Sequence, residues 1–160
     1  TDIGPMITPE AAKATLRSID DSGGKIIIGG EYRRLNDYNT LLYPAIVRDV
    51  PEDSSLMSSE LFAPVLSVNS FTGIDEALEK VENTGYGLQT GIYTNDLNLA
   101  RKAFEYLTVG GVIINDVPTF RADLMPYGGQ KQSGLLREGP EFAIEHLTYI
   151  KSTVIERGDT

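Results

Sequence analysis

The sequence predicts an α/β protein whose sheet is largely parallel and is covered by helices on both faces. Short apolar stretches typical of strands alternate with amphipathic stretches of helical period, and this alternation builds βαβ units with parallel strands. The length of 160 residues corresponds to about one domain. An apolar fraction of 41% and a charged fraction of 23% are ordinary for a soluble globular domain.

The first half of the chain is predicted to hold one helix and several strands. The helix begins at Thr8, which suits an N-cap, with Pro9 at the first helical position, and Gly23 and Gly24 end it. The remaining predicted elements are a short buried strand at 25–28, extended structure at 41–50 interrupted by Pro44, an irregular stretch at 51–64 with one helical turn, and a strand at 65–71.

The second half is predicted to alternate between helices and strands. A helix at 73–87 places Ile74, Leu78 and Val81 on one face, and a helix at 95–111 directs Leu97, Ala100, Phe104 and Leu107 inward. The other predicted elements are strands at 88–94, 111–116 and 148–156, a loop at 117–134 and a short helix at 141–147. The loop is long for a compact domain, and such loops are often functional.

Charge and residue usage exclude several classes of function. The net charge of −9 argues against binding to nucleic acid or to an anionic membrane surface. No apolar stretch is long enough to span a bilayer, and the chain does not open on a signal peptide. With no cysteine and only His146, neither a metal site nor a cysteine nucleophile is expected within these residues. These features fit a cytoplasmic protein.

The stretch "PYGGQKQSGLLREGP" at 126–140 suggests a phosphate-binding loop at first sight. In a P-loop the lysine follows the last glycine of the motif, and Lys131 does not meet that spacing. The stretch "GYGLQTG" also fails the dinucleotide fingerprint, because Thr90 occupies the position of its last glycine. The glycines are therefore interpreted as sites of tight turns or close backbone approach.

Several polar side chains have both a functional and a plain structural interpretation. Glu60 and Phe62 could hold a ribose hydroxyl and a flat cofactor group, or be an exposed acid and a core aromatic. Residues 115–127 follow a strand end, where ligands of open parallel sheets bind, but could also form a packed surface loop. Glu138 could relay a proton or pair with Arg137. His146 is interpreted as a packed helical residue, and the series Glu76, Glu79 and Glu82 as a solvated helix face.

Taken in order, six stretches resemble the aldehyde dehydrogenase superfamily: "DIGPMI", "ELFAPV", "NTGYGLQTGIYTNDL", "GGVIIND", "MPYGGQKQSGLLREGPEFAIEHLT" and "IK". The resemblance covers essentially the whole chain. It implies the C-terminal part of an NAD(P)-dependent aldehyde dehydrogenase. Residues 1–147 would form part of the catalytic domain, and residues 148–160 would form an oligomerisation strand and tail.

The resemblance also implies a reaction. In this family a cysteine thiolate attacks the aldehyde, hydride passes to the nicotinamide of NAD or NADP, and a glutamate-activated water hydrolyses the thioester. Family members carry that cysteine, that glutamate, the oxyanion-hole asparagine and the dinucleotide-binding domain upstream of the "GPMI" stretch. No catalytic residue is therefore expected here, and the chain alone is expected to be inactive. The implied partners are a small-molecule aldehyde and further copies of the chain, as a homodimer or homotetramer.

The resemblance assigns roles to individual residues. Glu60 matches the glutamate that holds the nicotinamide ribose, and Phe62 matches the aromatic beside the nicotinamide. Asn115 ends the strand before the substrate loop, and Phe120 and Tyr127 match aromatic positions of the aldehyde funnel.

The glycine-rich stretch also receives a role. Glu138 matches an acidic position of a proton path, and Lys131 is not a phosphate ligand but part of a substrate-side turn. Two positions depart from the family pattern, which usually has glycine at Ala63 and often at Leu136. Ala63 fits if its φ stays negative. A leucine at position 136 affects the geometry of the turn that carries Glu138, and with it the role of Glu138.

Arg121 follows Phe120 directly in the substrate loop. Because guanidinium binds carboxylate well, Arg121 is a candidate to pair with an anionic aldehyde such as a semialdehyde acid. The alternative is an outward surface arginine.

Two other classes of protein are alternatives. One is a non-catalytic aldehyde dehydrogenase-like module kept for oligomerisation and interaction. The other is a stand-alone flavodoxin-like nucleotide binder, which lacks the phosphate-binding turn that should follow an early strand.

Overall fold

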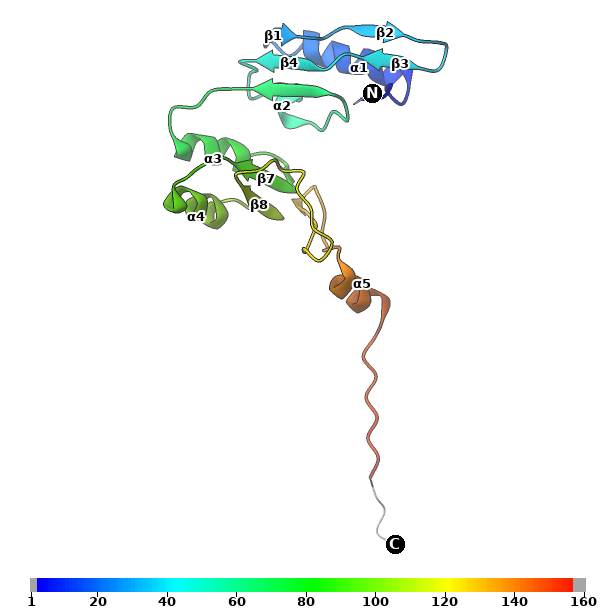
Figure 1. The fold of residues 1–160 in the computed structure, drawn as a ribbon, viewed down its shortest axis with the longest axis vertical. Helices are drawn as coiled ribbons and strands as arrows, with labels where there is room; N and C mark the ends of the chain where they lie inside the picture. The colour runs from blue at the N-terminus through cyan, green and yellow to red at the C-terminus, as the bar shows by residue number, and fades with distance from the viewer. Residues whose placement is uncertain (1–2, 157–160) are drawn as a thin grey trace. The chain divides into compact units, whose positions relative to one another are not determined.

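The structure is a computed structural model that describes residues 3–156. The chain folds as two compact units that divide between Gly73 and Ile74, and each unit has its own sheet and its own core (Figure 1). Mixed α/β structure is therefore confirmed.

The first unit combines a mixed sheet of three strands with a two-stranded hairpin. In the order β1-β4-β5, β1 runs antiparallel to β4 and β4 runs parallel to β5, while β2 and β3 form the antiparallel hairpin. The elements are α1 (Pro9–Asp20), β1 (Lys25–Ile28), β2 (Tyr32–Arg34), β3 (Thr40–Leu42), β4 (Ala45–Arg48), α2 (Ser55–Ser58) and β5 (Val65–Val68).

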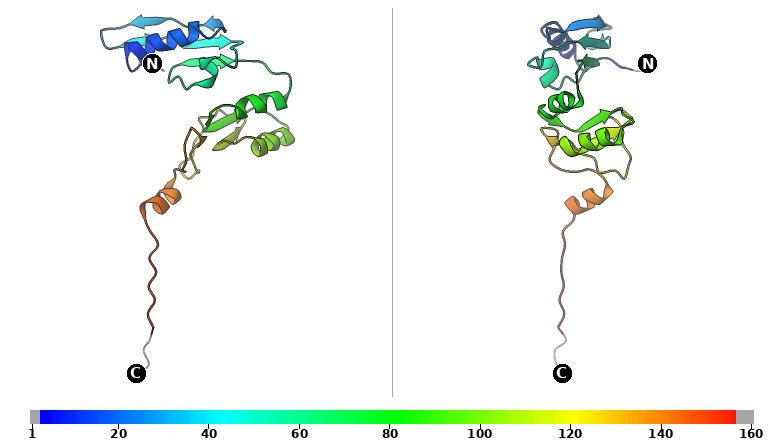
Figure 2. Two further views of the ribbon diagram at one scale, coloured as in Figure 1. Left: turned by 180° about the vertical axis from the view of Figure 1, so that it is seen from behind. Right: turned by 90° about the vertical axis from the view of Figure 1, so that its left-hand side faces the viewer.

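Helix α1 begins where the sequence predicted. The Thr8 hydroxyl accepts a hydrogen bond from the Ala11 N–H at 3.0 Å, and Pro9 occupies the first turn. Helix α1 lies across the strands of its unit (Figure 2), and its Ile19 joins Val47 of β4 and Leu56 of α2 in the core. The two helices and the sheet thus share one apolar layer.

Strand β1 forms as predicted but is not buried. Ile26, Ile27 and Ile28 are 41%, 51% and 60% exposed. β1 is the edge strand of its sheet, whereas the core is centred on β4. On the far side of β4, Leu66 of β5 is also exposed. An apolar run predicts a strand correctly, but its burial depends on which elements lie over it.

The second unit contains two helices packed on a parallel strand pair. Strands β7 and β8 pair in parallel, and β6 and β9 pair antiparallel. Leu78 of α3, Ala103 of α4 and Leu107 form the centre of the core. The elements are α3 (Ile74–Glu82), β6 (Tyr86–Gly87), β7 (Gln89–Ile92), α4 (Leu97–Tyr106), β8 (Gly111–Ile114), β9 (Gln130–Lys131) and α5 (Pro140–Leu147).

Helix α4 differs from the prediction in the face that it buries. Ala103 is fully buried and Leu107 is 7% exposed, but Leu97 and Phe104 are 84% and 72% exposed. The small Ala103 lets α4 approach its neighbours closely, so the buried stripe is narrow and the other two residues lie on its flank. The predicted inward direction of Leu97 and Phe104 is wrong.

The predicted largely parallel sheet is replaced by small mixed sheets. Among the strands of residues 3–156, β4–β5 and β7–β8 are the parallel pairs, and the other three pairings are antiparallel. Helix α3 follows β5 but leads to strands of a different sheet, so the crossover does not extend the first sheet. Residues 148–156, predicted as a strand, carry no strand assignment and are exposed. A strand requires a neighbour for its N–H and C=O groups, and the described residues provide none for this segment.

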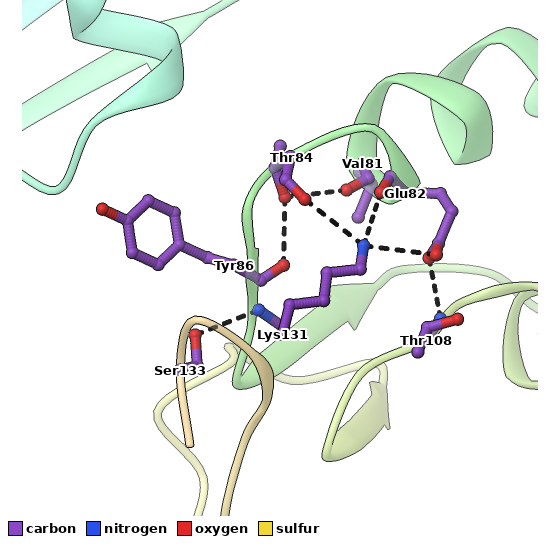
Figure 3. A network of polar contacts seen from close by, with 8 residues as sticks. Val81, Glu82, Thr84, Tyr86, Thr108, Lys131 and Ser133 are labelled. Atoms are coloured by element: carbon purple, nitrogen blue, oxygen red, sulfur yellow. Dashed lines mark hydrogen bonds and ion pairs between the residues drawn. The ribbon is translucent and has the colours of Figure 1, made fainter. Parts of the chain in front are cut away.

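Three segments of the second unit meet around Lys131 (Figure 3). Its ammonium binds the main-chain oxygen of Glu82 and lies 3.2 Å from Oε1 of the same residue. The Thr108 N–H donates to Oε2 of Glu82 at 2.7 Å. Nearby, the Gly87 N–H donates to the Ser133 hydroxyl at 3.0 Å. These contacts fasten the glycine-rich loop, residues 126–140, to the end of α3, and we call them the Lys131 network.

The prediction that Glu82 lies on a solvated face is wrong, because its side chain is only 25% exposed. The hydrogen bond from the Thr108 N–H lowers the pKa of the Glu82 carboxyl, and the positive charge of Lys131 also lowers it. Partial burial raises this pKa, but by less than the other effects lower it. The charged form of Glu82 therefore stabilises the folded unit.

Replacing this carboxylate tests the network. A carboxyl whose pKa is lowered in the folded protein stabilises the fold at pH values above its ordinary pKa of 4.5. This stabilisation is lost as the pH falls through the pKa of the folded state. Glu82→Gln should lower the free energy of unfolding of this chain by about 1–3 kcal/mol near neutral pH, and this deficit should shrink in acid. Denaturant unfolding at a series of pH values measures the difference.

The matched control is Glu79→Gln on the exposed part of the same helix. It should change the free energy of unfolding by less than about 0.5 kcal/mol. A deficit for Glu82→Gln that stays constant in acid would contradict a role for the carboxylate charge.

Candidate functional site

Glu60 and Phe62 lie in the segment between α2 and β5 of the first unit. The Phe62 side chain is 85% exposed, and its backbone is left-handed, with φ of 46°. Glu60 is also exposed. The alternative interpretation of Phe62 as a core residue is therefore wrong.

A bulky residue in the left-handed region is a genuine outlier, and such strain of roughly 1–3 kcal/mol collects at functional sites. Here it displays an aromatic ring on the surface of the unit. Ala63, where the family pattern usually has glycine, is not among the residues with positive φ. The left-handed position is Phe62 itself, so the side chain at Ala63 causes no strain.

Asn115 ends β8, next to the end of its parallel partner β7. Its N–H donates to the Ile92 carbonyl at 2.8 Å, and its Oδ1 accepts from the Thr94 N–H at 2.8 Å. Its φ is 61°, a conformation that asparagine tolerates better than most residues. Asn115 therefore caps both strands at their carboxyl ends, the edge of a parallel pair where ligands bind.

Three of the predicted residues meet beyond Asn115. The Arg121 guanidinium donates to Oε2 of Glu138 at 3.0 Å and lies 4.3 Å from the centre of the Tyr127 ring. Tyr127 and Glu138 also exchange main-chain hydrogen bonds of 2.6 and 3.1 Å. Cation, aromatic ring and carboxylate thus form one cluster, in which the side chains of Arg121 and Glu138 are 53% and 68% exposed.

The predicted ion pair between Arg137 and Glu138 does not form. Arg137 instead donates to the carbonyl oxygens of Gly129 and Leu136 at 2.9 and 3.2 Å. Adjacent residues of an extended segment point in opposite directions. Glu138 is therefore free to pair with Arg121 of the substrate loop, by which we mean residues 117–125.

An open groove of about 520 Å³ borders this cluster. Gly128 and Gly129 allow the close approach that the sequence suggested, since a Cβ at these positions would lie 2.2 Å from Leu136 O and 2.5 Å from Ser133. His146 is exposed and lines the groove, so its interpretation as a packed residue is wrong. The lining residues are Leu88, Tyr127, Gly128, Gly129, Ser133, Gly134, Leu135, Leu136, Arg137, Glu138 and His146.

The second unit carries exposed side chains that can bind a small ligand. The cluster supplies a cation, an aromatic face and a carboxylate, and Phe120, 46% exposed, adds a second aromatic ring. Among residues 3–156, no group of histidine, aspartate and glutamate side chains could hold a metal ion. None of the helices in that range is long and apolar enough to cross a bilayer.

Gln89 and the Lys131 network could not be predicted from the sequence. Gln89 lies on β7 and contacts the substrate loop 29 and 31 residues further along the chain. Lys131 contacts residues 47 and 49 positions before it. No local pattern marks contacts over such separations. The only signal was an unusual lysine among glycines.

Comparison with known proteins places this fold. The sequence pattern of the aldehyde dehydrogenase family matches residues 1–153. Lactaldehyde dehydrogenase of Methanococcus maripaludis is 43% identical over 97% of the chain, and the chain spans 33% of that enzyme. The chain thus covers about a third of the length of the curated relatives that it matches.

Solved structures of aldehyde dehydrogenases match the fold of this chain as well. The glyceraldehyde-3-phosphate dehydrogenase GapN of Methanocaldococcus jannaschii, complexed with NADP, superposes with a TM-score of 0.87 at 40% identity, covering 98% of this chain and 34% of GapN. Aldehyde dehydrogenase 21 of Physcomitrella patens, in complex with the product succinate, gives 0.83 at 41% identity, over 91% and 30%. An NAD+ complex of a Bacillus cereus aldehyde dehydrogenase gives 0.83 at 30% identity, over 94% and 31%. Relatives therefore bind NAD+ or NADP.

A family pattern that spans nearly the whole chain, together with relatives of about 40% identity and matching structures, leads to one conclusion: this chain belongs to the aldehyde dehydrogenase family.

Proposed function

We propose that this chain supplies the nicotinamide contact, the substrate loop and the oligomerisation segment of an NAD(P)-dependent aldehyde dehydrogenase. The observation that carries the proposal is Phe62, an exposed aromatic ring held in a strained backbone two residues after Glu60. Strain of this kind persists where function requires it. The chain has no cysteine, so the thiolate that attacks the aldehyde comes from outside these residues and the chain alone is inactive.

The residues of the first unit fit a nicotinamide cofactor. Glu60 offers a carboxylate that accepts hydrogen bonds from ribose hydroxyls, and Phe62 offers a flat apolar face. NAD or NADP accepts the hydride when bound, while these residues orient it.

The second unit supplies groups that suit the binding of an aldehyde. Phe120 and Tyr127 provide aromatic walls, and Asn115 holds the strand ends from which the substrate loop departs. To Glu138, which is exposed and lines the groove, we assign the transfer of protons to and from solvent.

Arg121 gives the site a preference for anionic aldehydes. Its guanidinium has more N–H donors than the bond to Glu138 uses, and its side chain is 53% exposed. A substrate carboxylate or phosphate can therefore share Arg121 with Glu138. GapN is a glyceraldehyde-3-phosphate dehydrogenase, and succinate is the reaction product bound to aldehyde dehydrogenase 21; glyceraldehyde 3-phosphate and succinate are both anionic.

Residues 148–155 provide the assembly contact. Tyr149, Ile150, Val154 and Ile155 are 82–99% exposed, and an extended segment with free N–H and C=O groups pairs readily with a strand of another chain. This segment makes the enzyme a homodimer or homotetramer, and the protein acts in the cytoplasm.

Turnover of aldehydes tests the function directly. The complete gene product that contains these residues should form NAD(P)H with a panel of aldehydes, and this chain alone should not, because it lacks a thiol nucleophile. Absorbance of NAD(P)H measures the rate. Turnover by this chain alone would contradict the assignment of the nucleophile. If neither protein formed NAD(P)H, a non-catalytic interaction module would be favoured.

Glu60→Gln in the complete gene product tests the cofactor contact. It should slow single-turnover hydride transfer by roughly tenfold or more while changing the Kd of the cofactor less, because one orienting contact is lost and the rest of the dinucleotide stays bound. Asp53→Asn, an exposed acid nearby, is the control. An unchanged hydride-transfer rate in Glu60→Gln would reject this role.

Arg121→Ala tests the preference for anionic substrates. The ratio of kcat/KM for carboxylated over neutral aldehydes should fall by roughly tenfold, the effect of one charge-assisted hydrogen bond at a half-exposed site. Arg121→Lys, which keeps the charge, should lose less. We would abandon the assignment if the ratio in Arg121→Ala equalled that of the wild type.

A further inference from the structure

The side chain of Gln89 connects the sheet of the second unit to the substrate loop. Gln89 is the first residue of β7, and its Nε2 donates to the carbonyl oxygens of Pro118 and Phe120 at 2.7 and 3.1 Å. One amide group therefore binds the main chain on both sides of residue 119, directly before Arg121.

The orientation of this amide follows from its partners. Both contacts are to carbonyl oxygens, so the NH2 group must face the loop, since the reverse orientation would place oxygen against oxygen. The other atom, Oε1, is buried and accepts no hydrogen bond from the residues that the structure describes. An unpaired buried acceptor is unfavourable, so the contact with the loop is the interaction that explains a glutamine here.

Room for the side chain comes from the neighbouring strand. Gln89 lies opposite Gly111 of β8, and a Cβ at position 111 would lie 3.0 Å from Oε1 of Gln89. That distance is tighter than ordinary van der Waals contact. Gly111 thus leaves the space that the amide occupies.

The rest of the loop is held weakly. Within residues 117–125 there are two short-range main-chain hydrogen bonds, from Phe120 N to Val117 O at 3.2 Å and from Met125 N to Ala122 O at 3.0 Å. At the start of the loop the Val117 N–H also donates to Oδ1 of its neighbour Asp116 at 2.7 Å. The bond from Arg121 to Glu138 is exposed, and solvent weakens such pairs. The Gln89 amide binds two carbonyl oxygens of the loop at once, directly before Arg121, and is therefore the contact that attaches the main chain of Pro118 and Phe120 to β7.

We propose that Gln89 is a positioning residue that holds the substrate loop at Pro118 and Phe120 and thereby sets which aldehydes the site accepts. Loss of the amide releases Phe120 and Arg121 together. The part of this inference that concerns specificity rests on the aldehyde dehydrogenase function proposed above, whereas the part that concerns the loop does not.

Limited proteolysis tests the loop without requiring activity. Trypsin cleaves after Arg121, so release of the loop in Gln89→Leu should raise the initial rate of that cleavage in this chain by roughly tenfold, as expected for two lost hydrogen bonds. Gln89→Glu, which keeps the shape but opposes oxygen to oxygen, should act in the same direction. Mass spectrometry of the first fragments identifies the bond that is cut.

Two controls separate a released loop from a destabilised protein. Cleavage after Arg101, within α4 of the same unit, should not change. Asn98→Leu, an exposed amide on α4, should leave cleavage after Arg121 at the wild-type rate. Unchanged cleavage after Arg121 in both Gln89 variants, or an equal increase after Arg101, would overturn the proposal.

Substrate preference in the complete gene product tests the consequence. Gln89→Leu should lower the ratio of kcat/KM for anionic over neutral aldehydes several-fold, because Arg121 loses its fixed position. This ratio does not depend on the fraction of folded enzyme. An unchanged ratio alongside faster cleavage would refute the role in specificity. If the wild type turns over no aldehyde, the proposed function fails, and proteolysis alone still decides whether Gln89 holds the loop.

Discussion

The second unit depends on the Lys131 network, because this is where its glycine-rich loop is fastened. The ammonium of Lys131 contacts the carboxylate and main-chain oxygen of Glu82 at the end of α3, and the Thr108 N–H completes the site from the segment before β8. The side chains of both partners are about three-quarters shielded from solvent. Shielding strengthens the attraction between charges, so a loop that leaves Leu135 and Leu136 exposed can still hold a defined conformation, in which Tyr127 pairs with Glu138.

Unusual backbone conformation recurs at the candidate site residues. Phe62, Asn115 and Lys131 all have positive φ, although none is glycine. Asn115 and Lys131 are compensated by the hydrogen bonds of their own side chains. Phe62 has no such compensation from its exposed ring. Strain that local contacts do not explain is the best structural indication that an external group completes a site.

Much apolar surface remains exposed in this chain. The isoleucines of β1, Leu66 of β5 and residues 149–155 are all substantially accessible to solvent. The chain spans about a third of the relatives that it matches. Contiguous apolar surface of this kind is typical of faces that another segment or another chain covers.

Local rules in the sequence determined the helices and most of the strands. Thr8 and Pro9 define the start of α1, and period-2 and period-3.6 patterns define β5, α3 and β8, because capping and side-chain periodicity act over a few residues. The order of motifs also indicated the family, and candidate site residues could be named from it. The roles of those residues remain predictions.

Tertiary structure alone decided which apolar side chains are buried, which strands pair with one another, and which residues the polar side chains contact. Whether Ile27 or Phe104 is covered depends on neighbouring elements, and the antiparallel β6–β9 pair joins residues more than 40 positions apart. The same holds for Arg121 with Glu138, Lys131 with Glu82, and Gln89 with the substrate loop. Such contacts form only when the chain has closed long loops, and no short window of sequence contains both partners.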